Sequence, residues 1–122
     1  PGTSMNLPFD YDRVTPGPFG DPAAPAVPFD RARVAIVPVP WERVGPTRSP
    51  IRGGPQAILA ASAQLEFWDE EMECDASRIG ICTLPEMELP YASAEQALAE
   101  IRRVAAELIG RDKFPVFLGG EH

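Results

Sequence analysis

Cysteine, histidine and long apolar runs are scarce in this sequence of 122 residues, and each shortage excludes a class of protein. The only two cysteines, Cys74 and Cys82, are too few for a disulfide scaffold and lack the close Cys or His partners of a zinc site. No segment approaches the ~18 consecutive apolar residues of a membrane span, and no signal-peptide pattern is present. We therefore expect a soluble, cytoplasmic protein with reduced thiols and no membrane partner.

Basic residues are also few, with 11 Lys and Arg against 18 Asp and Glu and a net charge of −7. A nucleic-acid surface needs clustered Lys and Arg, so we expect no nucleic-acid partner. An acidic field instead favours small cationic substrates.

Proline divides the chain, because 11 of its 15 prolines lie within residues 1–50. Residues 1–4 read as a cloning scar before a natural start at Met5, and residues 5–32 form a proline- and aromatic-rich N-terminal arm. Proline prevents regular helix or central strand in this arm. Its rings are expected to dock on the parent domain or a neighbouring subunit, a mobile tail being the alternative; they are Phe9, Tyr11, Phe19 and Phe29.

Three short apolar runs, at residues 33–39, 78–83 and 115–118, predict strands covered on both faces. Two helices are predicted between them, at residues 53–67 and 93–109. The alternation of strand and helix indicates an α/β fold with a parallel sheet between two helical layers, a three-layer α-β-α arrangement.

Each predicted helix has its own boundary signals. The first begins with Pro55 at its first position, where a missing N–H costs nothing. The second begins at Ser93, whose hydroxyl is expected to accept from the Gln96 N–H, and Gly110 supplies its stop signal. Its apolar stripe is Ala97, Leu98, Ile101, Val104, Ala105 and Leu108.

The last predicted strand leads directly into Gly-Gly-Glu-His at residues 119–122. In open parallel sheets, sites form beyond the carboxyl ends of the strands, and the loop at residues 40–54 after the first strand lies there too. Imidazole is a common ligand of first-row metals, so His122 is a candidate metal ligand, although a single histidine after two glycines is more often an ordinary surface or turn residue.

Three segments together resemble the ureohydrolase family, which contains the arginases, agmatinases and formiminoglutamases. Residues 34–41 resemble its opening strand, and residues 52–58 resemble its arginine-x-glycine-proline helix entry. Residues 112–122 resemble the strand leading to its first metal-binding motif, Gly-Gly-(Glu or Asp)-His. The form with Glu121 is typical of agmatinases and their relatives.

The resemblance implies that residues 33–122 are the N-terminal part of an arginase-like α/β domain, truncated at the first metal-ligand motif. It implies two manganese ions per subunit, with His122 as one ligand and no separate cofactor-binding residues. The catalytic residues and other ligands are expected beyond residue 122, in Asp-x-His-x-Asp and Asp-x-Asp segments. The implied reaction is hydrolysis of agmatine to putrescine and urea, by a homo-oligomer. The 122-residue chain alone is expected to be inactive.

Several departures from the family pattern leave the substrate open. Glu42 stands where an aspartate is usual, Pro50 where a glycine is common, and Leu59 where an arginine is usual. Guanidinobutyrate, arginine and formiminoglutamate therefore remain alternative substrates.

Two alternative functions, neither of them enzymatic, also remain open. One is a non-catalytic ureohydrolase-like binding or interaction module. The other is a phosphate-binding half-domain, against which Pro38 and Pro40 stand where a Gly-x-Gly-x-x-Gly loop would be needed.

Several charged and aromatic residues are predicted to have structural roles. The acidic run at residues 66–75 is predicted to be a solvated helix end and loop, and Lys113 an exposed turn residue. Arg52 is predicted to tie its loop to neighbouring carboxylates or carbonyls. Trp41 either lines the entrance of the site or covers the sheet edge.

Overall fold

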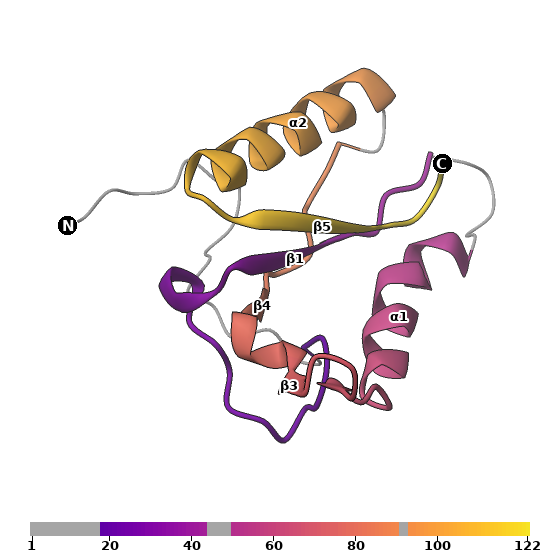
Figure 1. The fold of residues 1–122 in the computed structure, drawn as a ribbon. Coiled ribbons are helices and arrows are strands. Elements are labelled where there is room, and N and C mark those ends of the chain that lie inside the picture. Colours follow the sequence, from indigo (N-terminus) through magenta and orange to yellow (C-terminus); the bar gives the residue numbers. More distant parts are fainter. Residues whose placement is uncertain (1–17, 44–49, 91–92) are drawn as a thin grey trace.

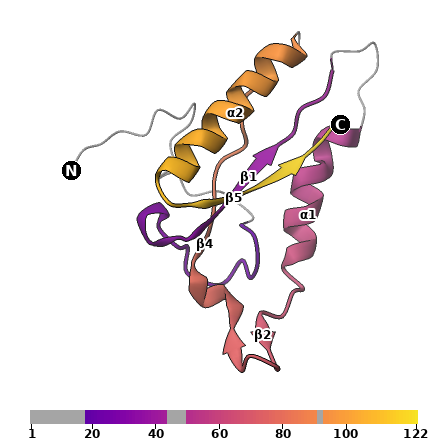
Figure 2. The same ribbon diagram turned by 45° about the horizontal axis from the view of Figure 1, so that its top comes forward.

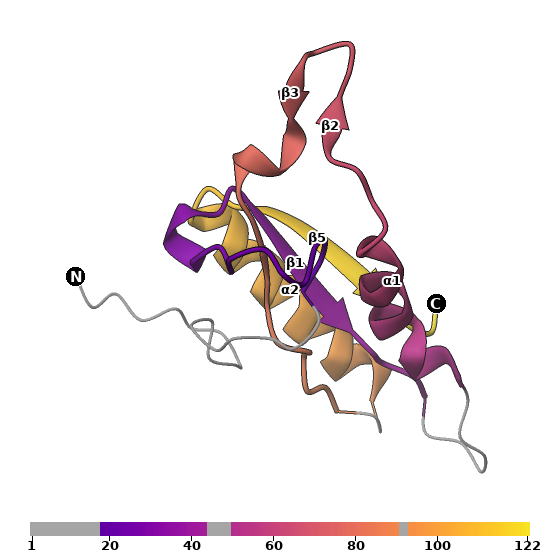
Figure 3. The same cartoon turned by 90° about the horizontal axis from the view of Figure 1, so that it is seen from below.

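The protein is described here by a computed structural model, in which residues 18–43, 50–90 and 93–122 are described. Three parallel strands, β1 (Val34–Val39), β4 (Ile81–Thr83) and β5 (Phe114–Gly119), form one sheet in the order β4-β1-β5. Helix α1 (Gly54–Ser62) covers one face and helix α2 (Ala94–Gly110) covers the other (Figure 1 and Figure 3). The predicted three-layer α/β fold is therefore confirmed.

Strand β1 is the centre of the protein and is buried on both faces, as its unbroken apolar run predicts. Ala35, Val37 and Val39 belong to the main core cluster with three buried residues of α2, which are Ala97, Val104 and Leu108. The alternate residues Ile36 and Pro38 point to the opposite face, where α1 buries Leu59.

A proline within this central strand costs no ladder hydrogen bond. The short strand β4 pairs only with Val34, Ala35 and Ile36, so it has ended before Pro38. The carbonyl of Pro38 accepts from the Met87 N–H on that side (3.0 Å), which shows that the side faces a loop and not a strand. The missing N–H of Pro38 therefore lies where no strand requires it.

Helix α1 ends earlier than predicted. It runs from Gly54 to Ser62 after a short 3-10 helix, η2 (Pro50–Gly53), so the predicted end near residue 67 is wrong. The Ser62 hydroxyl donates to the Leu59 carbonyl (2.6 Å) and accepts from the Gly20 N–H (2.9 Å). A serine hydroxyl that bonds to a backbone carbonyl competes with the backbone hydrogen bonds of the helix. The same hydroxyl is also bonded to a residue 42 positions away, which holds the end of the helix at this point.

Helix α2 follows its prediction closely. Ser93 caps its first turn by accepting from the Gln96 N–H (3.2 Å). The stop differs in detail, because Gly110 is the last helical residue and Asp112 takes the left-handed conformation instead (φ 60°). Leu98, predicted to join the buried stripe, is 65% exposed.

The acidic run contains a hairpin that the prediction missed. Strands β2 (Trp68–Asp69) and β3 (Cys74–Asp75) pair antiparallel and project away from the sheet (Figure 2). The 3-10 helix η3 (Ala76–Ile79) follows, and Asp75 caps it by accepting from the N–H and hydroxyl of Ser77. These hydrogen bonds lower the pKa of Asp75 below its ordinary value.

Strand β4 consequently starts at Ile81, and the predicted start at residue 78 is wrong. Gly80 has a φ of 87°, which breaks the extended conformation before the strand. A Cβ on Gly80 would lie 2.8 Å from the Arg31 carbonyl oxygen, so glycine is required at this approach.

The described part of the N-terminal arm packs on the domain. Phe29, in the 3-10 helix η1 (Phe29–Arg31), is buried in the core cluster, and Phe19 meets Phe67 edge-on with ring centroids 6.1 Å apart. Phe9 and Tyr11 lie outside the described residues. The boundaries of the arm as a separate unit, residues 5–32, stay a prediction.

The predicted exposed position of Lys113 is wrong. Its ammonium donates to the carbonyls of Phe29 (2.6 Å) and Ala32 (2.7 Å), so it joins the start of β5 to η1. Over the described ranges, neither helix is both long and apolar enough to cross a membrane.

Candidate functional site

The three segments singled out by the sequence meet at one end of the sheet. In the parallel ladder Gly119 is the partner of Val39, so β1 and β5 end side by side. A Cβ on Gly54, at the start of α1, would lie 3.1 Å from the Gly119 carbonyl oxygen. Figure 1 shows the C-terminus beside the end of β1 and the first turn of α1. This edge is the place where parallel α/β folds form their sites.

Gly120 brings the end of β5 against the loop that follows β1. A Cβ at this position would lie 2.6 Å from the Trp41 carbonyl oxygen and 3.3 Å from that of Ile51. The next residue, Glu121, donates its N–H to the same Trp41 carbonyl (2.8 Å). The second glycine of the Gly-Gly pair is therefore required by the close approach of two backbones.

The Glu121 carboxylate also bonds to this loop. Its Oε2 accepts from the Arg43 N–H at 2.6 Å, across 78 positions in the sequence. Glu121 thus contacts the β1 loop through both its backbone and its side chain. In the sequence, Glu121 was notable only as the form of the motif that is typical of agmatinases. No sequence signal indicated that its carboxylate would bond to Arg43.

An ion pair anchors the same loop to the helix entry. The Arg52 Nε lies 2.7 Å from Oε1 of Glu42, whose side chain is 6% exposed, whereas that of Arg52 is 37% exposed. The prediction that Arg52 ties its loop to a carboxylate is confirmed. The departure from aspartate to Glu42 supplies the partner.

Trp41 covers the end of the sheet. It is half-buried and packs on the core cluster, and its Nε1 donates to the Pro90 carbonyl (3.2 Å). Of the two interpretations of Trp41, the structure supports the covering one.

His122 follows this fastened strand end and is exposed. A manganese site fits the position in part, since an exposed imidazole on a rigid strand end can serve as one ligand. Within residues 18–43, 50–90 and 93–122, no group of three His, Cys, Asp or Glu side chains could hold a metal ion. Among the described residues, His122 therefore lies at this edge of the sheet without a complete set of metal ligands around it.

The comparisons with known proteins agree with this geometry. The model of the Arginase family matches residues 32–122. The N(1)-aminopropylagmatine ureohydrolase of Synechocystis sp. is 33% identical over 96 residues, covering 75% of this chain and 31% of the relative. The agmatinase of Bacillus cereus is 29% identical over 94 residues, covering 77% of this chain and 32% of the relative.

A solved structure shows the same fold. The agmatine ureohydrolase of Thermoplasma volcanium superposes with a TM-score of 0.65 at 24% identity, over 76% of this chain and 31% of that one. The chain spans about a third of the length of the curated relatives that it matches. Because the family model covers most of the sequence and the fold agrees, this chain belongs to the arginase family.

Proposed function

We propose that these residues form the N-terminal part of the catalytic domain of a manganese-dependent ureohydrolase that hydrolyses a linear guanidine, with agmatine as the first substrate to test. The observation that supports this most directly is the position of His122. It stands exposed at the carboxyl end of β5, on a strand end held to β1 and close to the entry of α1. Membership of the arginase family supplies the class of reaction.

The proposed reaction adds water to the guanidinium carbon. The bond from that carbon to the alkyl-bearing nitrogen breaks, which releases urea and the alkyl amine; with agmatine the amine is putrescine. When bound, the metal ions would supply an activated water nucleophile for a carbon that is otherwise a poor electrophile. The role of this chain would be to hold one imidazole ligand in place, while its net charge of −7 favours a cationic substrate.

The 122-residue chain by itself is proposed to bind no manganese specifically and to hydrolyse no guanidine. One imidazole is too few, because useful metal sites normally take three or four protein ligands. Calorimetric titration of the chain with Mn²⁺ should show no saturable heat at micromolar metal. A one-to-one site of micromolar affinity would contradict the proposal.

The decisive experiment is to read the source gene onward from the codon for His122 and to assay its whole product. An open frame through Asp-x-His-x-Asp and Asp-x-Asp segments would supply the remaining ligands. The product with Mn²⁺ should then release urea from agmatine or from N(1)-aminopropylagmatine, the compound named in one relative. Guanidinobutyrate and arginine complete the urea assay, and formiminoglutamate, which is not a guanidine, is assayed by the release of formamide.

Two variants give this assay its control. His122→Asn should abolish hydrolysis and weaken manganese binding, whereas Glu71→Gln, at the exposed hairpin, should leave both unchanged. A product without the carboxylate segments, or one that is inactive on every compound of the panel, would favour the non-catalytic binding module. We further propose that the whole protein is a cytoplasmic homo-oligomer, and light scattering of the purified product would test its oligomeric state.

A further inference from the structure

The β1–β5 ladder ends in an unusual way. Beyond its last pair, Val39 and Gly119, the Trp41 N–H turns back to the Val39 carbonyl (2.8 Å), and the register slips by one residue, so that the Glu121 N–H donates to the Trp41 carbonyl (2.8 Å). If the register of the ladder continued, the Trp41 carbonyl would accept from the His122 N–H, and the Arg43 N–H would donate to the backbone carbonyl of His122. Here the Arg43 N–H donates to Oε2 of the Glu121 side chain instead (2.6 Å).

We infer that Glu121 is a positioning residue for His122: its N–H and its carboxylate make the two bonds that the ladder register would give to the backbone of His122. The loop after β1 stays fastened to the end of β5, while the backbone beyond Glu121 is released from the sheet. His122 therefore leaves the sheet at a defined point and presents an exposed imidazole. The ligand role of that imidazole rests on the proposed function, whereas the fastening by Glu121 does not.

Contacts of the neighbouring residues also hold this strand end in place. Gly120 permits the close approach of the two backbones, since a Cβ there would lie 2.6 Å from the Trp41 oxygen. Glu42, which immediately precedes Arg43, is paired with Arg52 and so fastens the same loop to the entry of α1. The loop is thus held from β5 on one side and from the helix on the other.

The length of the Glu121 side chain matters to this role. Aspartate is one methylene shorter, so its carboxylate would reach the Arg43 N–H only if the backbone moved. Glutamine keeps the length and one acceptor oxygen but loses the charge that strengthens the bond. The bond lies at the surface, so its loss should be felt locally and not throughout the fold.

The test is nuclear magnetic resonance of the metal-free 122-residue chain, which reports on the fastening without any catalytic activity. In Glu121→Ala, amide hydrogen exchange at Arg43 should accelerate about tenfold. The order parameter of the His122 amide should fall below about 0.6, while the core amides of Ala35 and Val37 keep their protection. Glu121→Gln should show a smaller acceleration, and Glu121→Asp should behave like the alanine variant.

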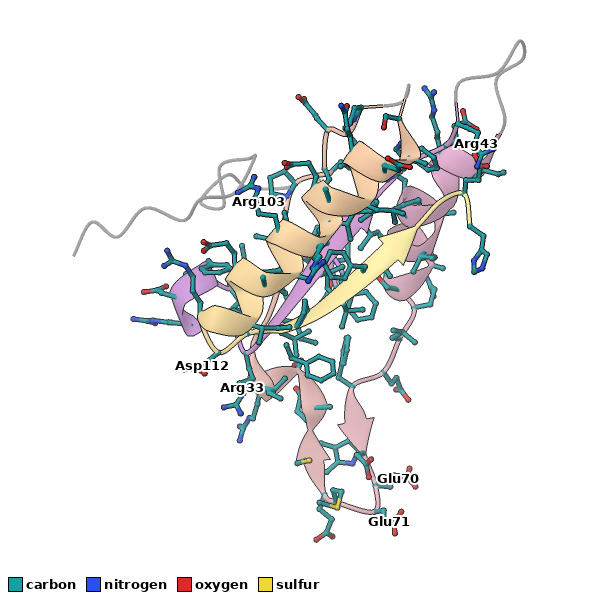
Figure 4. The ribbon with its side chains drawn as sticks, turned by 90° about the horizontal axis from the view of Figure 1, so that it is seen from above. Arg33, Arg43, Glu70, Glu71, Arg103 and Asp112 are labelled. Carbon is teal, nitrogen blue, oxygen red and sulfur yellow. The ribbon has the colours of Figure 1, made fainter. Side chains whose placement is uncertain are left out.

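Glu71→Ala is the control, because it removes the same type of side chain at the exposed hairpin, away from Arg43 (Figure 4). Unchanged exchange at Arg43 and an unchanged order parameter at His122 in Glu121→Ala would overturn the inference. An unprotected Arg43 amide in the parent chain would overturn it too. If the alanine variant fails to fold, the glutamine and aspartate variants decide, and identical values for those two at Arg43 would contradict a role for side-chain length.

Discussion

The ammonium of Lys113 lies 2.6 Å from the Phe29 carbonyl oxygen and 4.6 Å from the centroid of the ring of the same residue. One charge thus contacts both the backbone and the aromatic face of a residue 84 positions earlier. The ammonium also donates to a second carbonyl, that of Ala32 (2.7 Å). The contact fastens the end of the N-terminal arm to the start of β5, at the opposite end of that strand from His122.

Replacing Lys113 by methionine should lower the free energy of unfolding by about 2 kcal/mol, because two hydrogen bonds and a cation–π contact are lost while the apolar stem is kept. Urea denaturation of the chain would measure the loss. Arg102→Met, at an exposed position on α2, is the control and should change stability by less than about 0.5 kcal/mol. Equal effects of the two substitutions would contradict this account of Lys113.

The Glu42–Arg52 pair should be asymmetric under mutation. Arg52→Met should cost about 2 kcal/mol, because it leaves a carboxylate that is 6% exposed without its cationic partner. The cost stays below that of a fully buried pair because the arginine side chain is 37% exposed. Combining it with Glu42→Gln should recover part of the loss.

A double-mutant cycle in urea would measure the coupling between these two residues. Strictly additive losses would show that the 2.7 Å contact contributes no interaction energy of its own.

The two adjacent glycines at the strand end should respond differently to alanine. Gly120→Ala places a methyl group 2.6 Å from the Trp41 carbonyl oxygen, so the backbones must separate at a cost of about 1–3 kcal/mol. Gly119→Ala meets nothing within 4 Å and should be close to neutral. Thermal denaturation of the two variants gives a direct comparison, and equal melting temperatures would refute the close approach.

The two thiols should differ in reactivity and in their effect on the pH dependence of stability. Burial raises the pKa of Cys82, and the nearby Lys113 charge opposes this only in part, whereas Cys74 is exposed. A thiol with a raised pKa in the folded state stabilises the fold below its unfolded pKa, and that stabilisation is lost as the pH rises through the folded value.

We therefore expect the free energy of unfolding to fall above the ordinary thiol value of 9.0, and to fall less in Cys82→Ala. At pH 8, iodoacetamide followed by mass spectrometry should label Cys74 first and Cys82 only as fast as the protein opens. Simultaneous labelling in the folded protein would contradict the burial of Cys82.

The sequence by itself determined the order along the chain of the three parallel strands and the two helices, and the edge of the sheet that carries the candidate site. The run at residues 34–39 is apolar at odd and even positions alike, which suits only a strand covered on both faces. Helix α2 could also be predicted from the sequence, because the Ser93 cap and the apolar stripe with a 3.6-residue period are local features. The Gly-Gly-Glu-His motif then located His122, since the carboxyl ends of parallel strands meet at one edge.

Tertiary structure alone decided which polar side chains hold that framework together. The Ser62 hydroxyl bonds to the backbone of Gly20, 42 positions away in the sequence. The Glu121 carboxylate bonds to the backbone of Arg43 across 78 positions, and the Lys113 ammonium to that of Phe29 across 84. Local patterns report the conformations that a segment prefers, whereas these bonds depend on where distant backbone groups come to lie once the sheet has formed. For this reason α1 ends early, Lys113 is not an exposed turn residue, and Glu121 contacts the loop that precedes the helix.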